Sequence, residues 1–132
     1  TETIMPDPVL VGRNPVKLEK LADRSGIDNW TTDLDSVLGD SRYSVYFDAQ
    51  TTNRRKQAVE KAIAAGKHIY CEKPTAVSTD DAYDLYRQAA KASVKNGVVQ
   101  DKLGLPGLVK LRNLIEKDFI GRILSLRGEF GY

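Results

Sequence analysis

The 132-residue sequence has little of several features that would point to particular classes of protein. It contains one cysteine, Cys71, so no disulfide can form within the chain, and a lone thiol is typical of the reducing cytoplasm. It has no apolar run long enough to span a bilayer and no signal-peptide pattern, so we expect no membrane partner. No spacing of histidine and cysteine resembles a metal site, so we expect no metal.

An excess of charge of one sign is also absent. The formal net charge is +2, which is too small to indicate nucleic acid as a partner. The densest basic run, Arg54-Arg55-Lys56, has no interleaved aromatic residues for base stacking. We interpret it as a solvated helix face, with a phosphate contact as the alternative, and we expect no nucleic-acid partner.

The apolar and turn-forming residues that are present indicate alternating strands and helices. Capping residues and apolar stripes predict helices that begin near Asn14, Thr32, Asn53, Thr79 and Pro106, and Gly26 and Gly66 are expected to end the first and third of them. Strands are predicted over residues 9–13, 43–47, 68–72, 98–102 and 122–132. This alternation is typical of an α/β fold with a parallel sheet and helical crossovers.

The carboxyl ends of the predicted strands are the places to look for a site, because parallel sheets bind ligands there. The strand over residues 68–72 ends in Glu72-Lys73-Pro74. Taken alone, this charged pair is more typical of a solvated strand end than of a site.

The surrounding sequence favours a site. The stretch "AIAAGKHIYCEKPTAVS", preceded by the loop "DAQTTN", resembles the signature of the Gfo/Idh/MocA oxidoreductases, the glucose–fructose oxidoreductase and inositol dehydrogenase group. The resemblance extends from about Val9 to Tyr132. It implies a dinucleotide-binding Rossmann domain over residues 1–120 and the first strand of a second, α+β domain over residues 121–132. It also implies an NAD(P)-dependent dehydrogenase that acts on the secondary alcohol of a sugar or cyclitol, and we expect a homo-oligomer.

The resemblance assigns roles to the Glu-Lys-Pro motif. Lys73 would hold the substrate hydroxyl and help to move its proton while hydride passes to the nicotinamide. Glu72 would accept a hydrogen bond from the nicotinamide ribose, and Pro74 would stiffen the turn, in the family commonly after a cis peptide bond.

Cofactor choice depends on the end of the strand over residues 9–13. An acidic residue there binds the ribose 2′-hydroxyl of NAD, whereas an arginine accommodates the 2′-phosphate of NADP. The sequence has Gly12-Arg13 and no acid, so we expect NADP to be preferred over NAD, although Arg13 is also compatible with simple solvation.

The remaining assignments follow the family pattern less closely. Thr51 and Thr52 would bind the ribose or nicotinamide side of the cofactor, with Asn53 beside them as the helix cap. Gln100 and Lys102 take the places of an asparagine and an arginine near the substrate. Lys56 stands where the family often has a histidine, so the sequence supports no role for that histidine.

Two family features are missing from the sequence. It has no G-x-G-x-x-G pyrophosphate loop, and the family's downstream aspartate and histidine are absent. We therefore expect a Rossmann-type sheet without its first strand, and a chain that is inactive alone. The alternative is a non-catalytic nucleotide-binding or oligomerisation module derived from the same fold.

Overall fold

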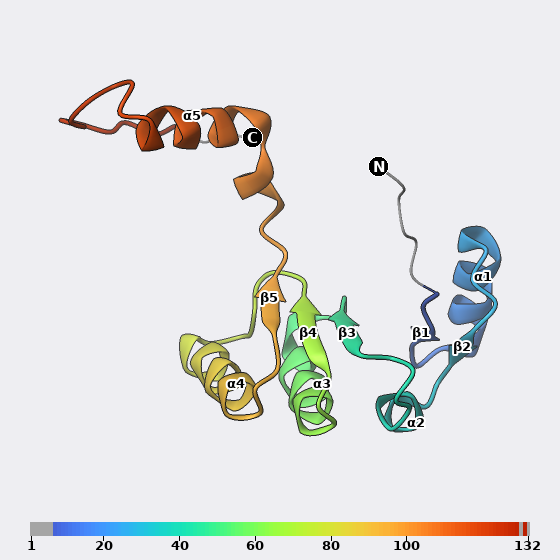
Figure 1. Ribbon diagram of the computed structural model, residues 1–132. Coiled ribbons are helices and arrows are strands. Elements are labelled where there is room, and N and C mark those ends of the chain that lie inside the picture. Colours follow the sequence, from blue (N-terminus) through green and yellow to red (C-terminus); the bar gives the residue numbers. More distant parts are fainter. Residues whose placement is uncertain (1–6, 130, 132) are drawn as a thin grey trace. The chain divides into compact units, whose positions relative to one another are not determined.

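The computed structural model describes residues 7–129 and 131. The chain forms two compact units, Thr1–Val99 and Gln100–Tyr132. Figure 1 labels the helices and strands of both units.

The first unit begins with a pair of short parallel strands joined by a helix. Strand β1 (Leu10–Val11) pairs with β2 (Trp30–Thr31), and helix α1 (Pro15–Ser25) connects them. The predicted cap is confirmed, because Asn14 Oδ1 accepts a hydrogen bond of 3.1 Å from the backbone N–H of Lys17. Gly26 ends the helix at a φ of 64°, as predicted. Strand β2 was not predicted, because two residues are too few to establish a periodic pattern.

A second parallel sheet follows in the same unit. Its strands are β3 (Val45–Asp48), β4 (His68–Cys71) and β5 (Asn96–Val98), paired in the order β3-β4-β5. Helices α2 (Leu34–Leu38), α3 (Thr52–Ala64) and α4 (Thr79–Lys91) complete the unit, α3 joining β3 to β4 and α4 joining β4 to β5. Parallel neighbours joined by helices confirm the predicted α/β class.

Three helices begin at other residues than predicted. Asp33, not Thr32, caps α2, and Ser78, not Thr79, caps α4, since their side chains accept hydrogen bonds from the backbone N–H of Ser36 and Asp81. Helix α3 begins after Thr51 rather than Asn53, and no side chain caps it. For α2 and α4, two neighbouring residues have side chains that could cap, and the one with the extended backbone and the hydrogen bond is the cap.

The order of strands confirms a Rossmann-type sheet without its first strand. The common dinucleotide-binding order, 3-2-1-4-5-6, becomes two separate sheets when strand 1 is removed. The structure has such a pair of sheets, β1-β2 and β3-β4-β5, with each pairing parallel. Within residues 7–129, β1 and β3 do not pair with each other, so the sheet does not close over the missing position.

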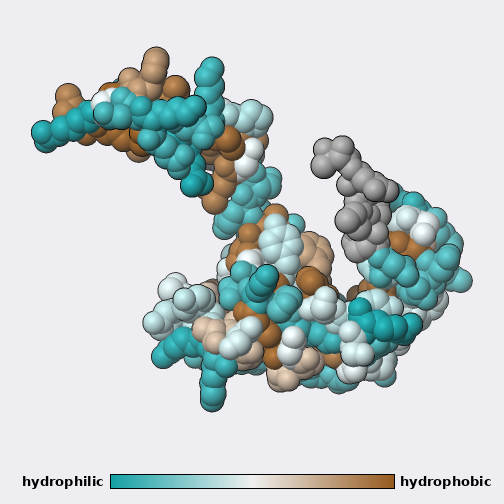
Figure 2. All heavy atoms as spheres, in the orientation of Figure 1, coloured by the Kyte–Doolittle hydropathy of each residue, from teal (hydrophilic) through white to brown (hydrophobic). Residues whose placement is uncertain are grey.

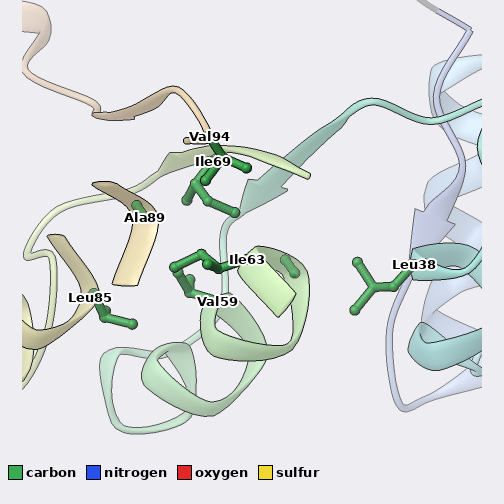
Figure 3. Close-up of a cluster of buried hydrophobic side chains, with 8 residues drawn as sticks. Leu38, Val59, Ile63, Ile69, Leu85, Ala89 and Val94 are labelled. Carbon is green, nitrogen blue, oxygen red and sulfur yellow. The ribbon is translucent and has the colours of Figure 1, made fainter. Parts of the chain in front are cut away.

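The hydrophobic core of the first unit lies between the larger sheet and its helices. Figure 3 shows side chains from α3, α4 and β4 turned toward one another. The buried members of this cluster are Leu38, Val59, Ala62, Ile63, Ile69, Leu85, Ala89 and Val94. Burial of these side chains fixes α3 and α4 against the sheet, and thereby fixes the loops that precede the two helices.

The second unit consists of a short 3-10 helix, η1 (Asp101–Gly104), and helix α5 (Pro106–Glu116). The strand predicted over 98–102 ends at Val98. Residues 122–129, predicted as a strand, contain none in the described part of the chain, because a strand needs a neighbour with which to pair. Residues 130 and 132 of that prediction lie outside the described residues.

Helix α5 is amphipathic, and its apolar side chains are exposed within its own unit. Figure 2 shows hydrophobic residues along this helix. The exposed ones at or next to it are Leu105, Leu108, Val109, Leu111 and Ile115. No helix in the described ranges is both long and apolar enough to cross a membrane.

Candidate active site

The predicted site residues of the first unit follow the carboxyl ends of three strands. Gly12 and Arg13 follow β1, Thr51 and Thr52 follow β3, and the segment 72–74 follows β4. The strands within each sheet are parallel, so the loops after β3 and β4 lie at the same edge of their sheet.

A cavity between β1 and β3 brings together predicted residues from two of these loops. Its volume is about 670 Å³. Gly12, Arg13, Gln50 and Thr51 line it at the carboxyl ends of the strands. Most of the remaining lining is apolar and includes Leu10, Leu18, Leu21, Leu34, Val37, Leu38, Val45 and Phe47. Thr52, Asn53 and the segment 72–74 are not part of this lining.

Gly12 allows α1 to pack closely against the end of β1. A Cβ atom at this position would lie 3.0 Å from Cδ2 of the buried Leu18, which is too close without a shift. Arg13, the next residue, is exposed. Gly12, which has no side chain, is therefore followed directly by the exposed guanidinium of Arg13. This arrangement is compatible with the phosphate-bearing side of a dinucleotide.

The Glu-Lys-Pro loop after β4 presents a lysine with an unoccupied ammonium group. The Lys73–Pro74 peptide bond is cis, as the resemblance implied. Glu72 Oε2 accepts a hydrogen bond of 3.1 Å from the backbone N–H of Lys73, so this carboxylate turns back onto its own loop. The Lys73 side chain is exposed and makes no hydrogen bond or ion pair with any residue in the described ranges. Its ammonium is available to a substrate hydroxyl.

A buried ion pair lies beneath the two loops of the larger sheet. Arg55, on α3, and Asp48, at the end of β3, are 1% and 0% exposed. Arg55 Nε donates to Asp48 Oδ1 at 2.8 Å, and its Nη2 donates to the carbonyl oxygen of Gln50 at 2.8 Å. Its Nη1 donates to the carbonyl oxygen of Pro74. One guanidinium therefore contacts the strand end, the loop after β3 and the loop after β4.

Asp48 has further hydrogen-bond partners. The Tyr46 hydroxyl donates to Asp48 Oδ2 at 2.9 Å, and the backbone N–H of Gln50 donates to Oδ1 at 3.1 Å. The Gln50 side-chain amide also donates to Oδ2, at 3.1 Å. Burial and the negative charge of Asp48 raise the pKa of Tyr46, which keeps its hydroxyl protonated as a donor.

The sequence-based interpretation of the basic run is wrong for one of its residues. Arg54 is exposed, and Lys56 Nζ forms an ion pair of 2.5 Å with Asp81 Oδ1 that links α3 to α4, but Arg55 is buried. The helical pattern contained the signal. Residue 55 precedes Ala58, Val59, Ala62 and Ile63 at intervals of three, four, seven and eight, which places all five on one face.

Two other residues of the family-like stretch have structural contacts. Lys67 is buried, and its Nζ donates to the carbonyl oxygens of Asp40 and Tyr43 at 2.7 and 2.6 Å. His68 Nδ1 accepts a hydrogen bond of 3.2 Å from the backbone N–H of Lys95, so this histidine has a partner within the fold. These contacts anchor β4 at the end opposite to the Glu-Lys-Pro loop.

The two predicted substrate residues, Gln100 and Lys102, belong to the second unit, at the N-cap and within η1. Their roles remain predictions. In the described part of the chain, no three residues among histidine, cysteine, aspartate and glutamate gather as a metal site would require.

Comparison with known proteins gives a consistent family. Residues 9–100 match the model of an oxidoreductase family with an NAD-binding Rossmann fold, Gfo/Idh/MocA. A D-xylose dehydrogenase from Paenarthrobacter nicotinovorans is 52% identical over 96% of this chain and 32% of its own length. A levoglucosan dehydrogenase from Pseudarthrobacter phenanthrenivorans is 30% identical over 92% of this chain and 31% of its own length.

Solved structures agree with these relatives. A levoglucosan dehydrogenase in complex with NADH and levoglucosan matches with a TM-score of 0.82 and 29% identity, over 88% of this chain and 31% of that one. An NAD-binding oxidoreductase from Klebsiella pneumoniae matches with a TM-score of 0.80 and 27% identity, over 86% and 30%. The chain thus spans about a third of the length of the proteins that it matches.

Proposed function

The chain belongs to the Gfo/Idh/MocA oxidoreductase family, and from that premise we propose that the full-length protein is an NAD(P)-dependent dehydrogenase of sugars or cyclitols. The observation that carries the proposal is Lys73, an exposed lysine without a partner among the described residues, at the carboxyl end of β4. The 52% identity to a D-xylose dehydrogenase makes D-xylose the first substrate to test.

The proposed roles follow from the chemistry of the side chains. Lys73 holds the hydroxyl of the reacting carbon and takes part in moving its proton as the carbonyl forms. A bound nicotinamide supplies the acceptor for hydride. Glu72, close to Lys73 in the same loop, accepts from the ribose, and Thr51 and Thr52 donate from the start of α3. Gln100 and Lys102 remain candidates for substrate contacts.

We also propose that NADP is preferred over NAD. Arg13 is exposed at the end of β1 and borders the cavity that Thr51 lines from the other side. The segment from Gly12 to Pro15 contains no carboxylate that would hold a ribose 2′-hydroxyl. The matched complex with NADH is of a different protein and leaves this choice open to measurement.

Homo-oligomerisation is a further part of the proposal. The apolar residues of α5 are exposed within the second unit, and such a face is covered in a folded assembly. Light scattering on the full-length protein measures the number of subunits.

The decisive experiment replaces Lys73 by alanine in the full-length protein. Loss of a general acid–base group should lower kcat by roughly 10²–10⁴-fold, with little change in cofactor affinity. Turnover is measured with D-xylose and a panel of polyols, and cofactor affinity by NADPH fluorescence. Lys91→Ala, at an exposed lysine in the last turn of α4, is the control and should retain parental turnover.

Two outcomes would count against the proposal. Turnover of Lys73→Ala within a few-fold of the parent would remove the lysine from the chemistry. Tight cofactor binding by the parent without turnover on any sugar or polyol would favour a nucleotide-binding module instead.

A further inference from the structure

We infer that Arg55 is a positioning residue for the proposed reaction, because it fixes the loop that carries Lys73 relative to the loop after β3. This inference rests on the proposed function. The two neighbours of Arg55 in the basic run have no such position: Arg54 is exposed, and Lys56 forms an ion pair with Asp81 between α3 and α4.

The geometry of the guanidinium supports this inference. Its three nitrogens donate in three directions: to the Asp48 carboxylate, to the Gln50 carbonyl and to the Pro74 carbonyl. The acceptors come from β3, from the loop before α3 and from the loop after β4. A planar fork of donors can hold three acceptors in one arrangement, whereas a lysine ammonium is a single point on a flexible stem.

Arg55 is the link between the loops that carry the proposed cofactor and substrate groups. Pro74 follows Lys73 directly, and Gln50 precedes Thr51 directly. Each loop is therefore held by a backbone carbonyl one residue away from a proposed site residue. Lys73 has no side-chain partner in the described part of the chain, so its position depends on the backbone of its loop.

Burial makes the link stiff. The side chains of Arg55 and Asp48 are 2% and 0% exposed, so water does not compete for the contact between the two charged groups. A buried ion pair stabilises a fold little more than a well-packed apolar pair would. Stability alone therefore does not require an arginine at this position, whereas holding a carboxylate and two carbonyls through three separate nitrogens does.

The test is a double-mutant cycle on turnover in the full-length protein. Arg55→Lys keeps the positive charge beside Asp48 but cannot reach all three acceptors. It should lower kcat by about 10- to 100-fold in the parent, because small misplacements of a reacting group have effects of this size. In the Lys73→Ala background the same change should have almost no effect, since the group that it positions is gone. Arg55→Lys should change NADPH affinity by the same factor in both backgrounds, because the loop after β3 that Arg55 also holds is present in both.

A merely structural arginine gives a different pattern. It would lower turnover by the same factor in both backgrounds, and that result would overturn the inference, as would full turnover of Arg55→Lys in the parent. Arg87→Lys, at an exposed arginine on α4, is the matched control and should be silent. Circular dichroism shows whether Arg55→Lys folds. If it does not, Asp48→Asn takes its place in the cycle, because this change removes the charge that orients the guanidinium. The same two patterns of turnover then decide.

The cycle also separates this inference from the proposed function. Parental turnover in Lys73→Ala alone would contradict the proposed function. A strong loss in Lys73→Ala, with an undiminished further loss on Arg55→Lys, would contradict only the role of Arg55.

Discussion

Arg13 is the residue on which the proposed cofactor preference depends. It is exposed, borders the cavity between β1 and β3, and follows a glycine that lets α1 pack closely. A guanidinium–phosphate contact contributes about 1.5–3 kcal/mol. Arg13→Ala in the full-length protein should therefore lower the preference for NADP over NAD by about tenfold or more.

The measurement for Arg13 is the ratio of kcat/KM values for the two cofactors. Arg24→Ala, an exposed arginine in the last turn of α1, is the control and should leave the ratio unchanged. Equal use of NADP and NAD by the parent would show that Arg13 does not select the cofactor.

Residues at the site could be predicted to different degrees. Glu72, Lys73 and Pro74 form a contiguous motif at a strand end, so their place was predictable and the structure agrees. Asp48 and Arg55 were missed, because each is charged and such residues are usually exposed. The helical spacing indicates that Arg55 lies on the buried face of α3, but its pairing with Asp48 is seen only in the fold.

At the scale of elements, the start of α4 provides a direct test of the structure against the sequence pattern. Ser78 Oγ accepts a hydrogen bond of 3.1 Å from the backbone N–H of Asp81, whereas Thr79 is the first residue of the helix. Ser78→Ala should destabilise the helix start by about 1 kcal/mol, which is about fivefold faster hydrogen exchange at the first amides of α4. Thr79→Ala should change exchange much less, because alanine is a good helix former and no cap is lost. Hydrogen–deuterium exchange with mass spectrometry measures both, and a larger effect for Thr79 would restore the sequence-based assignment.

Elements with strong local signals were predictable, and those that depend on neighbours were not. Helix α1 has a cap, a proline in its first turn and a left-handed glycine, all local features. Strand β2 exists because β1 lies beside it, and the segment 122–129 is not a strand because no partner lies beside it within the described residues. Pairing is a non-local property that a pattern of apolar residues does not contain.

At the scale of the whole molecule, each of the two sheets has an unpaired strand edge, on β1 and on β3, that borders the same cavity. Backbone groups alternate sides along a strand, and the N–H groups of Leu10 and Gly12 donate to carbonyls next to or in β2. The backbone groups of Val11 therefore point away from β2. The carbonyl oxygens of Ser44 and Asp48 accept from the backbone N–H groups of His68, in β4, and Glu72, directly after it. The backbone groups of Val45 and Phe47 therefore point away from β4. Each such group, if buried without a partner, costs about 1–3 kcal/mol.

The open edges lead to a prediction for the 132-residue chain expressed by itself. It should self-associate, because an exposed strand edge with apolar residues is a template for another chain, and it should show no dehydrogenase turnover. Val45, on β3, is 57% exposed and borders the cavity, so Val45→Lys should place a charge at the edge and reduce association. Val77→Lys changes a valine that is 70% exposed in the loop before α4, away from any strand edge, and should leave association unchanged. Light scattering as a function of concentration, with an NADP reduction assay on D-xylose, tests all three chains. A parent chain that stays monomeric and reduces NADP at an ordinary enzymatic rate would show that the open edges have no such consequence. Equal effects of the two lysine substitutions would show that added charge, and not the edge of β3, controls association.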